Sequence, residues 1–237
     1  MAENQVIEIQ SAEEEFSSTA YKGIYNRYVK RVIGFVIALI LFIVLIPVYL
    51  IISLAVVIDT GFPVLYKADR GGYKNKSFKI FKFRSMVKNA DKIGGGTTAL
   101  NDSRITKVGN ILRKTKLDEF PQLLNIIKGD MSFIGPRPEL LRYTQQYVGK
   151  EKYILEVRPG ITDYSSIEFI NLDELVGGEA NADEVYETKV LKKKNELRVK
   201  YVENVSFRTD VEIFFKTIGS VLEKAFGFLF KKEHRGN

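Results

Sequence analysis

The sequence predicts an α/β protein that is rich in helix and attached to a membrane by a bent apolar helix. The first observation is a stretch from Val32 to Ile58 that lacks any charged side chain and has Pro47 at its middle. The second is a pair of short runs with period-two alternation, which is typical of a β-hairpin. The third is a set of apolar residues at helical spacing between positions 111 and 127. A chain of 237 residues is long enough to bury a core around these elements.

Composition excludes several kinds of chemistry. Without cysteine the chain has no disulfide, no thiolate nucleophile and no Cys-ligated metal. The only histidine is His234, close to the C-terminus, so acid, base and nucleophile must come from carboxylates, Lys, Tyr, Ser or Thr. Most of the basic excess lies between residues 61 and 137. Such a field attracts the phosphates of nucleotides, nucleic acid or anionic lipids, and charge alone does not choose among them.

Residues 1–21 are polar and acidic, and residues 22–60 contain the apolar stretch. The tail has no basic segment of the kind that opens a signal peptide, and we expect it to be weakly structured. The apolar stretch exceeds the ~20 residues that span a bilayer as a helix. Basic residues flank it on both sides, and by the positive-inside rule both flanks then favour the cytoplasmic face.

The flanking charges favour a segment that enters and leaves the membrane by the same face. Proline removes a helix hydrogen bond, so we expect a bend at Ile46-Pro47. Two alternatives stay open. The helix could span the membrane, because proline also occurs in spanning helices, or it could be the buried helix of a soluble core.

A β-hairpin is expected after the apolar stretch. The runs Val64–Tyr66 and Ser77–Arg84 alternate and flank Arg70-Gly71-Gly72-Tyr73-Lys74. The second run would place Lys82 and Arg84 on the same face as Phe78 and Ile80. These two basic residues matter only if something anionic lies beside them, and an ordinary solvated strand is the plain alternative.

Two adjacent carboxylates, Asp118 and Glu119, follow a run of basic residues and precede an apolar helical pattern. If Thr115 is the N-cap, Asp118 completes a capping box; if Asp118 is the N-cap, Pro121 falls in the first turn. Both registers put the pair at a helix start. Capping acids are common there, so spacing alone leaves the pair between a cap and a catalytic site.

Two loops hold an arginine next to proline. Arg137 lies between Pro136 and Pro138, and Arg158 precedes Pro159. Prolines fix the backbone, which suits an arginine that must be preorganised for a phosphate or carboxylate. The alternative is a surface turn with a solvated arginine.

The last third of the chain predicts two peripheral features. Residues 171–187 are rich in Glu, Asp and Gly and are expected to form an acidic surface insertion. From Val211 to Phe230 apolar residues recur at helical spacing, and the end carries Phe226, Phe228 and Phe230 before two lysines. We expect this end to lie on the membrane surface, with an ordinary core helix as the alternative.

An ordered set of motifs then resembles a known family. The set is the apolar segment followed by Lys82-Phe83-Arg84-Ser85-Met86, Asp102-Ser103-Arg104-Ile105-Thr106, Leu112-Arg113, Leu117-Asp118-Glu119-Phe120-Pro121-Gln122-Leu123, Lys128-Gly129-Asp130-Met131-Ser132, Gly135-Pro136-Arg137-Pro138 and Arg158-Pro159-Gly160-Ile161-Thr162. It resembles the bacterial sugar transferases, the monotopic polyprenol-phosphate phosphoglycosyl transferases. The match covers roughly residues 28–218.

The resemblance implies a reaction and its partners. Such enzymes transfer a sugar phosphate from a nucleotide diphosphate sugar, usually a UDP-sugar, to polyprenol phosphate with Mg²⁺, releasing UMP. The reaction takes place at the cytoplasmic face of the bacterial inner membrane. The acceptor is undecaprenyl phosphate, nucleic acid is not expected as a partner, and a lipid-facing surface is compatible with a homodimer.

The resemblance also assigns roles to residues of this chain. Asp118 becomes the nucleophile that forms an aspartyl phosphosugar, and Glu119 its neighbour, with both as candidate Mg²⁺ ligands. The basic residues expected to bind substrate phosphate are Lys82, Arg84, Arg113, Arg137 and Arg158. The apolar helix becomes a re-entrant anchor bent at Pro47.

The expected organisation is a tail at 1–21, the membrane helix at 22–60, a catalytic domain at 61–218 and an interfacial segment at 219–237. Two positions depart from the family pattern. Asp163-Tyr164 stands where Gly-Trp is common, and Arg198 stands where an aspartate is common, which implies altered donor handling or another residue in that role. A non-catalytic scaffold that holds anionic lipid remains the alternative function.

Overall fold

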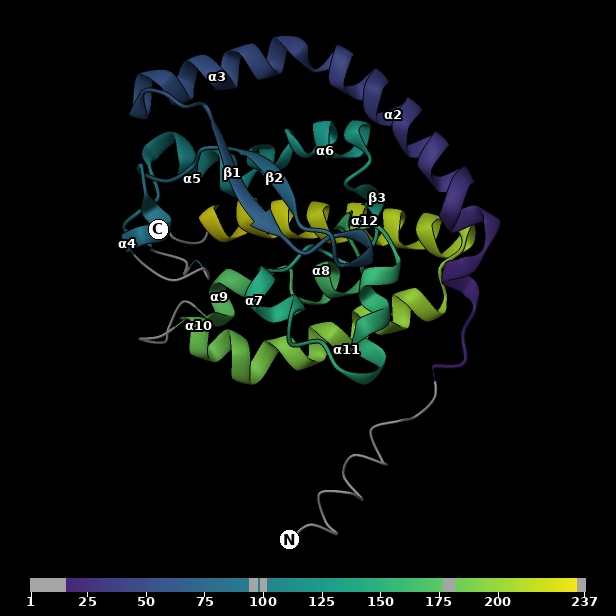
Figure 1. Ribbon diagram of the computed structural model, residues 1–237. Helices are drawn as coiled ribbons and strands as arrows, with labels where there is room; N and C mark the ends of the chain where they lie inside the picture. Colours follow the sequence, from purple (N-terminus) through teal and green to yellow (C-terminus); the bar gives the residue numbers. More distant parts are fainter. Residues whose placement is uncertain (1–15, 94–97, 99–101, 177–181, 234–237) are drawn as a thin grey trace, which may run out of the picture.

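The computed structural model describes residues 16–93, 98, 102–176 and 182–233, and it is a mixed α/β structure dominated by helices (Figure 1). Most of the acidic tail expected at 1–21 lies outside these residues. Two sheets of two strands each are described. The longer helical elements are η2 (Tyr25–Val29), α2 (Lys30–Val44), α3 (Ile46–Thr60), α5 (Lys107–Lys114), α6 (Gln122–Lys128), α11 (Leu191–Glu203) and α12 (Phe207–Glu233). Shorter helical elements are η1 (Ala20–Lys22), η3 (Tyr73–Asn75), α4 (Ala90–Ile93), η4 (Leu117–Glu119), α7 (Leu141–Thr144), η5 (Gly149–Glu156), α8 (Tyr164–Glu168), α9 (Leu172–Val176), α10 (Ala182–Val185) and η6 (Tyr186–Val190).

The apolar stretch forms an arch of two helices, α2 and α3, over one side of the molecule (Figure 1). The segments Tyr25–Val44 and Ile46–Thr60 meet at 62°. The helix breaks at Leu45, which is the N-cap of α3. Pro47 follows in the first turn of α3, where the missing backbone N–H of a proline is tolerated, so the proline fits directly after the bend. The expected bend is therefore present. Within the described residues no single helix has the length and hydropathy to cross a membrane, whereas the bent pair does by those two criteria.

The arch has one face against the body and one face open. Gly34, Ala38, Ile52 and Val56 are buried against the rest of the chain. The open face carries exposed apolar side chains along its whole length: Val32, Val36, Ile40, Ile43, Leu50, Ile51, Leu54 and Ile58. A helix of a soluble core would cover these side chains, and an apolar surface of this extent marks a membrane or protein contact. The open face therefore argues against the soluble-core alternative.

The predicted hairpin is present as β1 (Leu65–Arg70) and β2 (Phe78–Phe83), which pair antiparallel. Ile80 packs in a cluster with residues of α2 and α6, whereas Phe83 packs against α3 and α5. Helices thus cover both faces of β2, so the strand is not the half-solvated one that alternation suggests. Asn125 closes its free edge, because its side chain accepts from the Phe81 N–H at 3.0 Å and donates to the Lys79 carbonyl at 2.8 Å.

The carboxylate pair lies in a separate short turn, η4, between α5 and α6. Both capping registers expected from the sequence are wrong. Thr115 is the C-cap of α5, and its hydroxyl donates to the Ile111 carbonyl at 2.8 Å. Lys116 then adopts a left-handed conformation at φ 58° and starts the new turn, and Pro121 occupies the N-cap position of α6. The reversal at Lys116 makes the pair a connection between helices rather than a helix start.

The two arginine loops are brought together by a parallel sheet of β3 (Ser132–Ile134) and β4 (Gly160–Thr162). Gly135, at φ 155°, follows β3, and a Cβ there would lie 2.5 Å from the Arg158 carbonyl. Only glycine allows this approach. The sheet therefore fixes the loop that carries Arg137 against the loop that carries Arg158.

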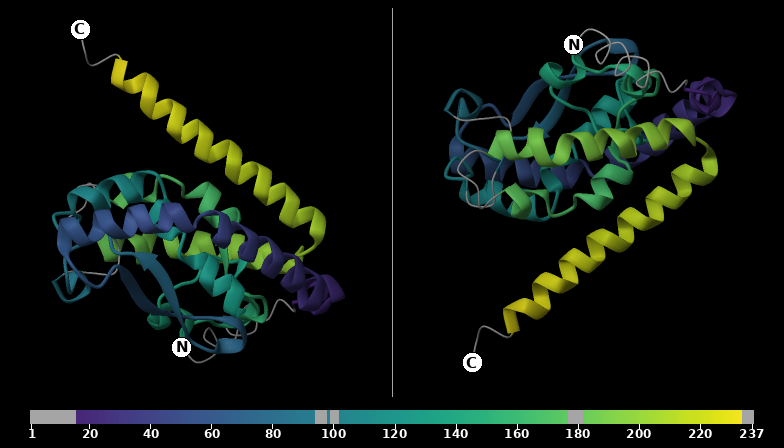
Figure 2. Two further views of the ribbon diagram at one scale, coloured as in Figure 1. Left: turned by 90° about the horizontal axis from the view of Figure 1, so that it is seen from above. Right: turned by 90° about the horizontal axis from the view of Figure 1, so that it is seen from below.

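The C-terminal helices differ from expectation in one place. Residues 171–187, expected as an acidic surface insertion, include α9 and α10, and Val176 and Tyr186 are buried. Helix α12 turns back after α11 and runs away from the body (Figure 2). Its Ile213 is fully buried, whereas Phe214, Phe215, Ile218 and Leu222 are exposed. The side chains of Phe226, Phe228 and Phe230 lie outside the described ones.

Candidate active site

Three elements converge on the carboxylate pair. The turn η4 supplies Asp118 and Glu119, strand β2 supplies Lys82, and the loop after β3 supplies Arg137. Asn125 ties β2 to α6 just behind them. The family resemblance assigned Asp118, Glu119, Lys82 and Arg137 to one site, and the fold brings these four side chains together.

Glu119 is held by two cations. Lys82 Nζ lies 3.0 Å from Glu119 Oε1. Arg137 Nη1 donates to Oε2 at 3.1 Å, and its Nη2 donates to Oε1, so the guanidinium engages both oxygens. Burial alone would raise the pKa of Glu119, but Arg137 and Lys82 outweigh it and hold that pKa well below its usual range. Glu119 is therefore a stable anion at neutral pH.

The surroundings of Asp118 shift its pKa in the opposite direction. Its residue is 5 % exposed, and its Oδ1 has no hydrogen-bond partner among the described residues. Burial, together with the charge of Glu119, raises the pKa of Asp118, although Lys82, Arg113 and Lys116 act against the rise. A buried carboxylate oxygen without a partner costs free energy. Asp118 Oδ1 is therefore a buried polar atom whose hydrogen-bonding capacity is unused within the described residues.

Gln122 is a further candidate that the sequence reasoning did not single out. It is the first residue of α6, four positions after Asp118, and it is fully buried. Neither Nε2 nor Oε1 of its side chain has a partner among the described residues. Two unpaired polar atoms in a buried amide are unusual. The only signal in the sequence was its place in the Asp-Glu-Phe-Pro-Gln-Leu motif.

The other basic residues expected at the site are spread more widely. Arg113, in the last turn of α5, acts electrostatically on Asp118. Arg84 is buried and donates from Nη2 and Nε to Thr60 Oγ1 at the end of α3, while its Nη1 is unpartnered. Arg158 donates to the Gly129 carbonyl at 3.1 Å and lies over the Tyr73 ring. The structure thus brings Lys82, Arg113 and Arg137 to the carboxylates, and it places Arg84 and Arg158 against other partners.

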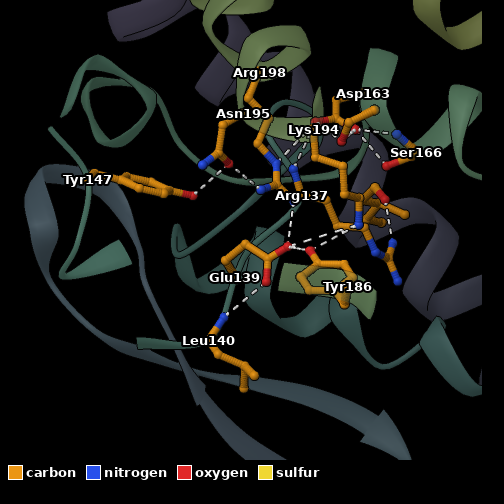
Figure 3. A network of polar contacts seen from close by, with 12 residues as sticks. Arg137, Glu139, Leu140, Tyr147, Asp163, Ser166, Tyr186, Lys194, Asn195 and Arg198 are labelled. Carbon is orange, nitrogen blue, oxygen red and sulfur yellow. Dashed lines mark hydrogen bonds and ion pairs between the residues drawn. The ribbon is translucent and has the colours of Figure 1, made fainter. Parts of the chain in front are cut away.

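A buried polar network supports Arg137 from behind (Figure 3). Asp163 Oδ2 accepts from the backbone N–H of Arg137 at 3.2 Å, and the Arg137 side chain also donates to the Ile161 carbonyl at 2.8 Å. Glu139, two residues after Arg137, forms an ion pair with Arg198 at 2.7 Å. The loop that presents Arg137 is thus held at Arg137 itself and again at Glu139.

Arg198, one of the two departures from the family pattern, lies at the centre of this network. It is fully buried and approaches Asp163 at 4.0 Å besides its ion pair with Glu139. Lys194 lies beside it, and burial together with the charge of Arg198 lowers the pKa of Lys194 to about 8. Glu139 and Asp163 are therefore the carboxylates that compensate the buried charge of Arg198.

The side chains around the carboxylate pair determine whether a divalent cation could bind there. The described residues contain no cluster of three or more Asp, Glu or His side chains that could hold a metal ion. Both oxygens of Glu119 already meet cations, whereas Asp118 Oδ1 is unpartnered. Mg²⁺ commonly binds through one or two carboxylates and completes its ligands with water and substrate phosphates. The residues present fit a magnesium ion of that kind, held by Asp118 and by the ligand.

The arrangement is suited to phosphoryl chemistry. One desolvated carboxylate with an unpartnered oxygen lies next to a second carboxylate that forms ion pairs with an arginine and a lysine. Phosphoryl transfer depends mainly on in-line positioning and on neutralisation of phosphate charge. The site holds a buried carboxylate beside cations, which is compatible with both requirements.

The comparisons with known proteins agree with this chemistry. A family model described as bacterial sugar transferase matches residues 25–224. The chain is 38% identical over 197 residues to the UDP-glucose:undecaprenyl-phosphate glucose-1-phosphate transferase of Escherichia coli (strain K12), covering 81% of this chain and 40% of that protein. It is 34% identical over 198 residues to the UDP-N-acetylgalactosamine-undecaprenyl-phosphate N-acetylgalactosaminephosphotransferase of Aeromonas hydrophila, with 82% and 44% covered.

A shorter relative is covered over most of its length. The chain is 39% identical over 176 residues to the uncharacterized sugar transferase EpsL of Bacillus subtilis (strain 168), covering 74% of this chain and 78% of that protein. Against the Escherichia coli and Aeromonas hydrophila relatives, by contrast, the chain spans less than half of their length.

Proposed function

The chain belongs to the bacterial sugar transferase family, and on that premise we propose that it transfers a sugar phosphate from a UDP-sugar to undecaprenyl phosphate. The two relatives named above that carry an activity in their names act on UDP-sugars and undecaprenyl phosphate. The observation that carries the proposal for this chain is Asp118, a buried carboxylate whose Oδ1 has no hydrogen-bond partner among the described residues and whose neighbours include Lys82 and Arg113.

The reaction proceeds through two displacements at phosphorus. In the first, an oxygen of Asp118 forms a bond to the β-phosphorus of the donor, the bond from that phosphorus to the bridging oxygen breaks, and UMP leaves. In the second, an oxygen of undecaprenyl phosphate attacks the same phosphorus and the bond to Asp118 breaks. Undecaprenyl diphosphate sugar leaves and the carboxylate is restored. Covalent capture lets one site serve a soluble donor and a lipid acceptor in turn.

The neighbouring residues bind and orient the reactants. Lys82 and Arg113 lie where they lower the cost of bringing phosphate anions to Asp118. Arg137 keeps Glu119 fixed and ionised, and Glu119 in turn keeps Lys82 directed at the site. Burial of Asp118 excludes the water that would compete for the phosphorus.

Magnesium is part of the proposal. Asp118, with the donor phosphates, would hold it, and Glu119 lies next to that position as the second candidate ligand. The magnesium ion, when bound, would neutralise the charge of the donor diphosphate and the charge that develops on the departing UMP.

The apolar arch of α2 and α3 supports the proposal that the reaction takes place at a membrane. Its open apolar face suits the acyl layer of a membrane, and its two ends lie beside basic segments. We place the protein on the cytoplasmic face of the bacterial inner membrane, with the arch re-entrant. A lipid acceptor could then reach Asp118 from the bilayer, because Tyr49 of the arch donates to the Phe120 carbonyl directly after the carboxylate pair.

The test uses the full chain in detergent with Mg²⁺, undecaprenyl phosphate and a panel of UDP-sugars, and it measures released UMP. At least one donor should yield UMP, and Asp118→Asn should reduce the rate by at least ~10³-fold, as loss of a nucleophile does. Donor without acceptor should add the mass of the sugar phosphate to the peptide that contains Asp118. The matched control, Asn110→Asp on the exposed side of α5, should keep the parent rate.

The competing function is a scaffold that binds anionic lipid without catalysis. It predicts no UMP from any donor and lipid binding that Asp118→Asn leaves intact. Unchanged UMP release in Asp118→Asn would instead refute Asp118 as the nucleophile while leaving the transferase activity in place.

A further inference from the structure

A cavity lies away from the carboxylate pair, near the start of the arch. It has a volume of about 240 Å³ and is lined by residues of η1, η2, the hairpin turn and η5. The lining residues are Tyr21, Lys22, Arg27, Tyr73, Lys74, Tyr153 and Glu156. None of the residues assigned to the transferase reaction lines it, so it is a separate site.

The cavity has an excess of positive charge. Lys22, Arg27 and Lys74 face one acid, Glu156. Within the described part of the chain none of the three cations forms an ion pair with a carboxylate. Lysines and arginines that outnumber the acids around a cavity and form no ion pair with them favour the binding of an anion.

The walls of the cavity are held in place. Phe16 stacks on Tyr153 with ring centroids 3.9 Å apart, and Tyr21 meets both rings edge-on. On the other side, the Arg158 guanidinium lies over the Tyr73 ring at 5.1 Å. This gives Arg158, which does not reach the carboxylates, a definite structural role.

The hairpin turn presents Lys74 in an unusual backbone state. Lys74 and the following Asn75 both have positive φ, 55° and 59°. A left-handed conformation in a residue other than glycine costs free energy and is found where the surroundings fix a functional position. The turn therefore holds Lys74, at the rim of the cavity, in a backbone conformation that costs free energy.

The cavity borders an apolar surface that leads to the arch. Ile24, Tyr28 and Val29, which lie within two residues of the cavity residues Lys22 or Arg27 in the chain, are 74%, 65% and 42% exposed. Beyond them the exposed face continues through Val32 into α2. A ligand that fits this setting has a negatively charged head for the cavity and an apolar tail for the adjoining surface.

We propose that this cavity binds the phosphate group of an anionic phospholipid, with the acyl chains lying along Ile24, Tyr28 and α2. The occupant is structural lipid rather than donor or acceptor, so the site goes beyond the transfer reaction. A free phosphate or a small phosphate ester has the same charged group as the lipid head, but it has no acyl chain that could contact the adjoining apolar surface. Phospholipid bound here anchors the first turns before the arch at the level of the lipid head groups.

The experiment measures binding of radiolabelled phosphatidylglycerol to the delipidated full chain in detergent, without donor or acceptor. Lys74→Gln should weaken binding about 5- to 10-fold. Lys76→Gln is the matched control, because Lys76 ends the same turn, is exposed and does not line the cavity. It should change binding less than about 2-fold. Lys22→Gln provides a second arm with the same expected loss as Lys74→Gln.

Three results would overturn the proposal. Equal losses in Lys74→Gln and Lys76→Gln would mean general surface attraction, which acts on every basic residue near an anionic surface. Displacement of the lipid by inorganic phosphate or glycerol 1-phosphate at equal concentration would assign the cavity to a free phosphate. Unchanged binding in both cavity variants would mean that the lipid binds elsewhere. UMP release in detergent should stay at the parent level in both cavity variants, which confirms folding and separates this test from that of the transferase.

Discussion

At the scale of residues, Asp118 and Glu119 are adjacent in the chain yet differ in electrostatic state. The guanidinium of Arg137 and the Lys82 ammonium hold Glu119 ionised, whereas Asp118 is desolvated and has one oxygen without a hydrogen-bond partner among the described residues. Environments that separate two neighbouring carboxyl groups are the usual sign of divided roles. The pair therefore fits one reacting group and one group that organises the charges around it.

Gln122 gives a prediction in which stability and activity change in opposite directions. Its buried amide has two atoms without partners, each of which costs about 1–3 kcal/mol when unsatisfied. Gln122→Met keeps the length and removes both polar atoms, so the apparent melting temperature should stay constant or rise. If the amide serves the ligand or orients Asp118, UMP release should fall at least ~10-fold.

Gln145→Met serves as the control, because Gln145 is exposed after α7. It should leave both quantities unchanged. A lower melting temperature with normal UMP release in Gln122→Met would show that the amide has a structural partner and no part in the reaction.

Glu139 gives a prediction about pH. Burial alone would raise its pKa, but Arg198 and Lys194 outweigh burial and lower the pKa from its ordinary value of 4.5 to about 2. A carboxyl whose pKa is lower in the folded state contributes stability above its unfolded pKa and loses it as pH falls toward its folded pKa. The difference corresponds to a contribution on the order of 3 kcal/mol at neutral pH.

Glu139→Gln should therefore lower the apparent melting temperature by roughly 6 to 12 °C at pH 7. The gap to the parent should shrink as pH falls from about 4.5 toward 2, because the parent loses the same contribution. Glu168→Gln, at an exposed acid, should show no such gap at any pH. A gap that stays constant down to pH 2 would mean that packing, rather than the ion pair with Arg198, accounts for the loss.

At the scale of elements, the features set by local chemistry could be predicted from the sequence. The charge-free stretch with Pro47 predicts a bent helix, and the structure has the bend at Leu45. Alternation predicts the hairpin, and β2 lies where expected, whereas β1 continues to Arg70, beyond the predicted Val64–Tyr66 and into the predicted turn. In both cases the signal is a repeat or a backbone restriction within a few residues, so no distant contact is needed to read it.

Features that depend on distant contacts could not be predicted in this way. The capping registers at the carboxylate pair were wrong because Lys116 takes a left-handed conformation that ordinary propensity does not favour. The orphan amide of Gln122 depends on how α6 packs, and the partners of Arg198 lie 35 and 59 residues away along the chain. The sequence predicted the same phosphate-binding role for Arg84, Arg137 and Arg158. Only the fold shows that Arg137 contacts the carboxylate pair and that the other two contact other partners.

At the scale of the whole molecule, the open apolar face of the arch decides how the protein meets a bilayer. The bend of 62° and the basic residues at both ends favour a helix that returns to the side it came from. A spanning arrangement would instead separate the tail from the catalytic side chains by the membrane. The two arrangements differ in where residues before and after the arch are found.

Cysteine labelling separates them, because the chain contains no cysteine of its own. Glu13→Cys reports the side of the tail, and Asn110→Cys reports the exposed side of α5. In sealed vesicles with the cytoplasmic face outward, a membrane-impermeant maleimide should label both positions to the same extent before and after permeabilisation. A re-entrant arch requires this result, since both ends of the arch then lie on one side. Labelling of one position only after permeabilisation would establish a spanning helix and move either the tail or the catalytic turn across the membrane.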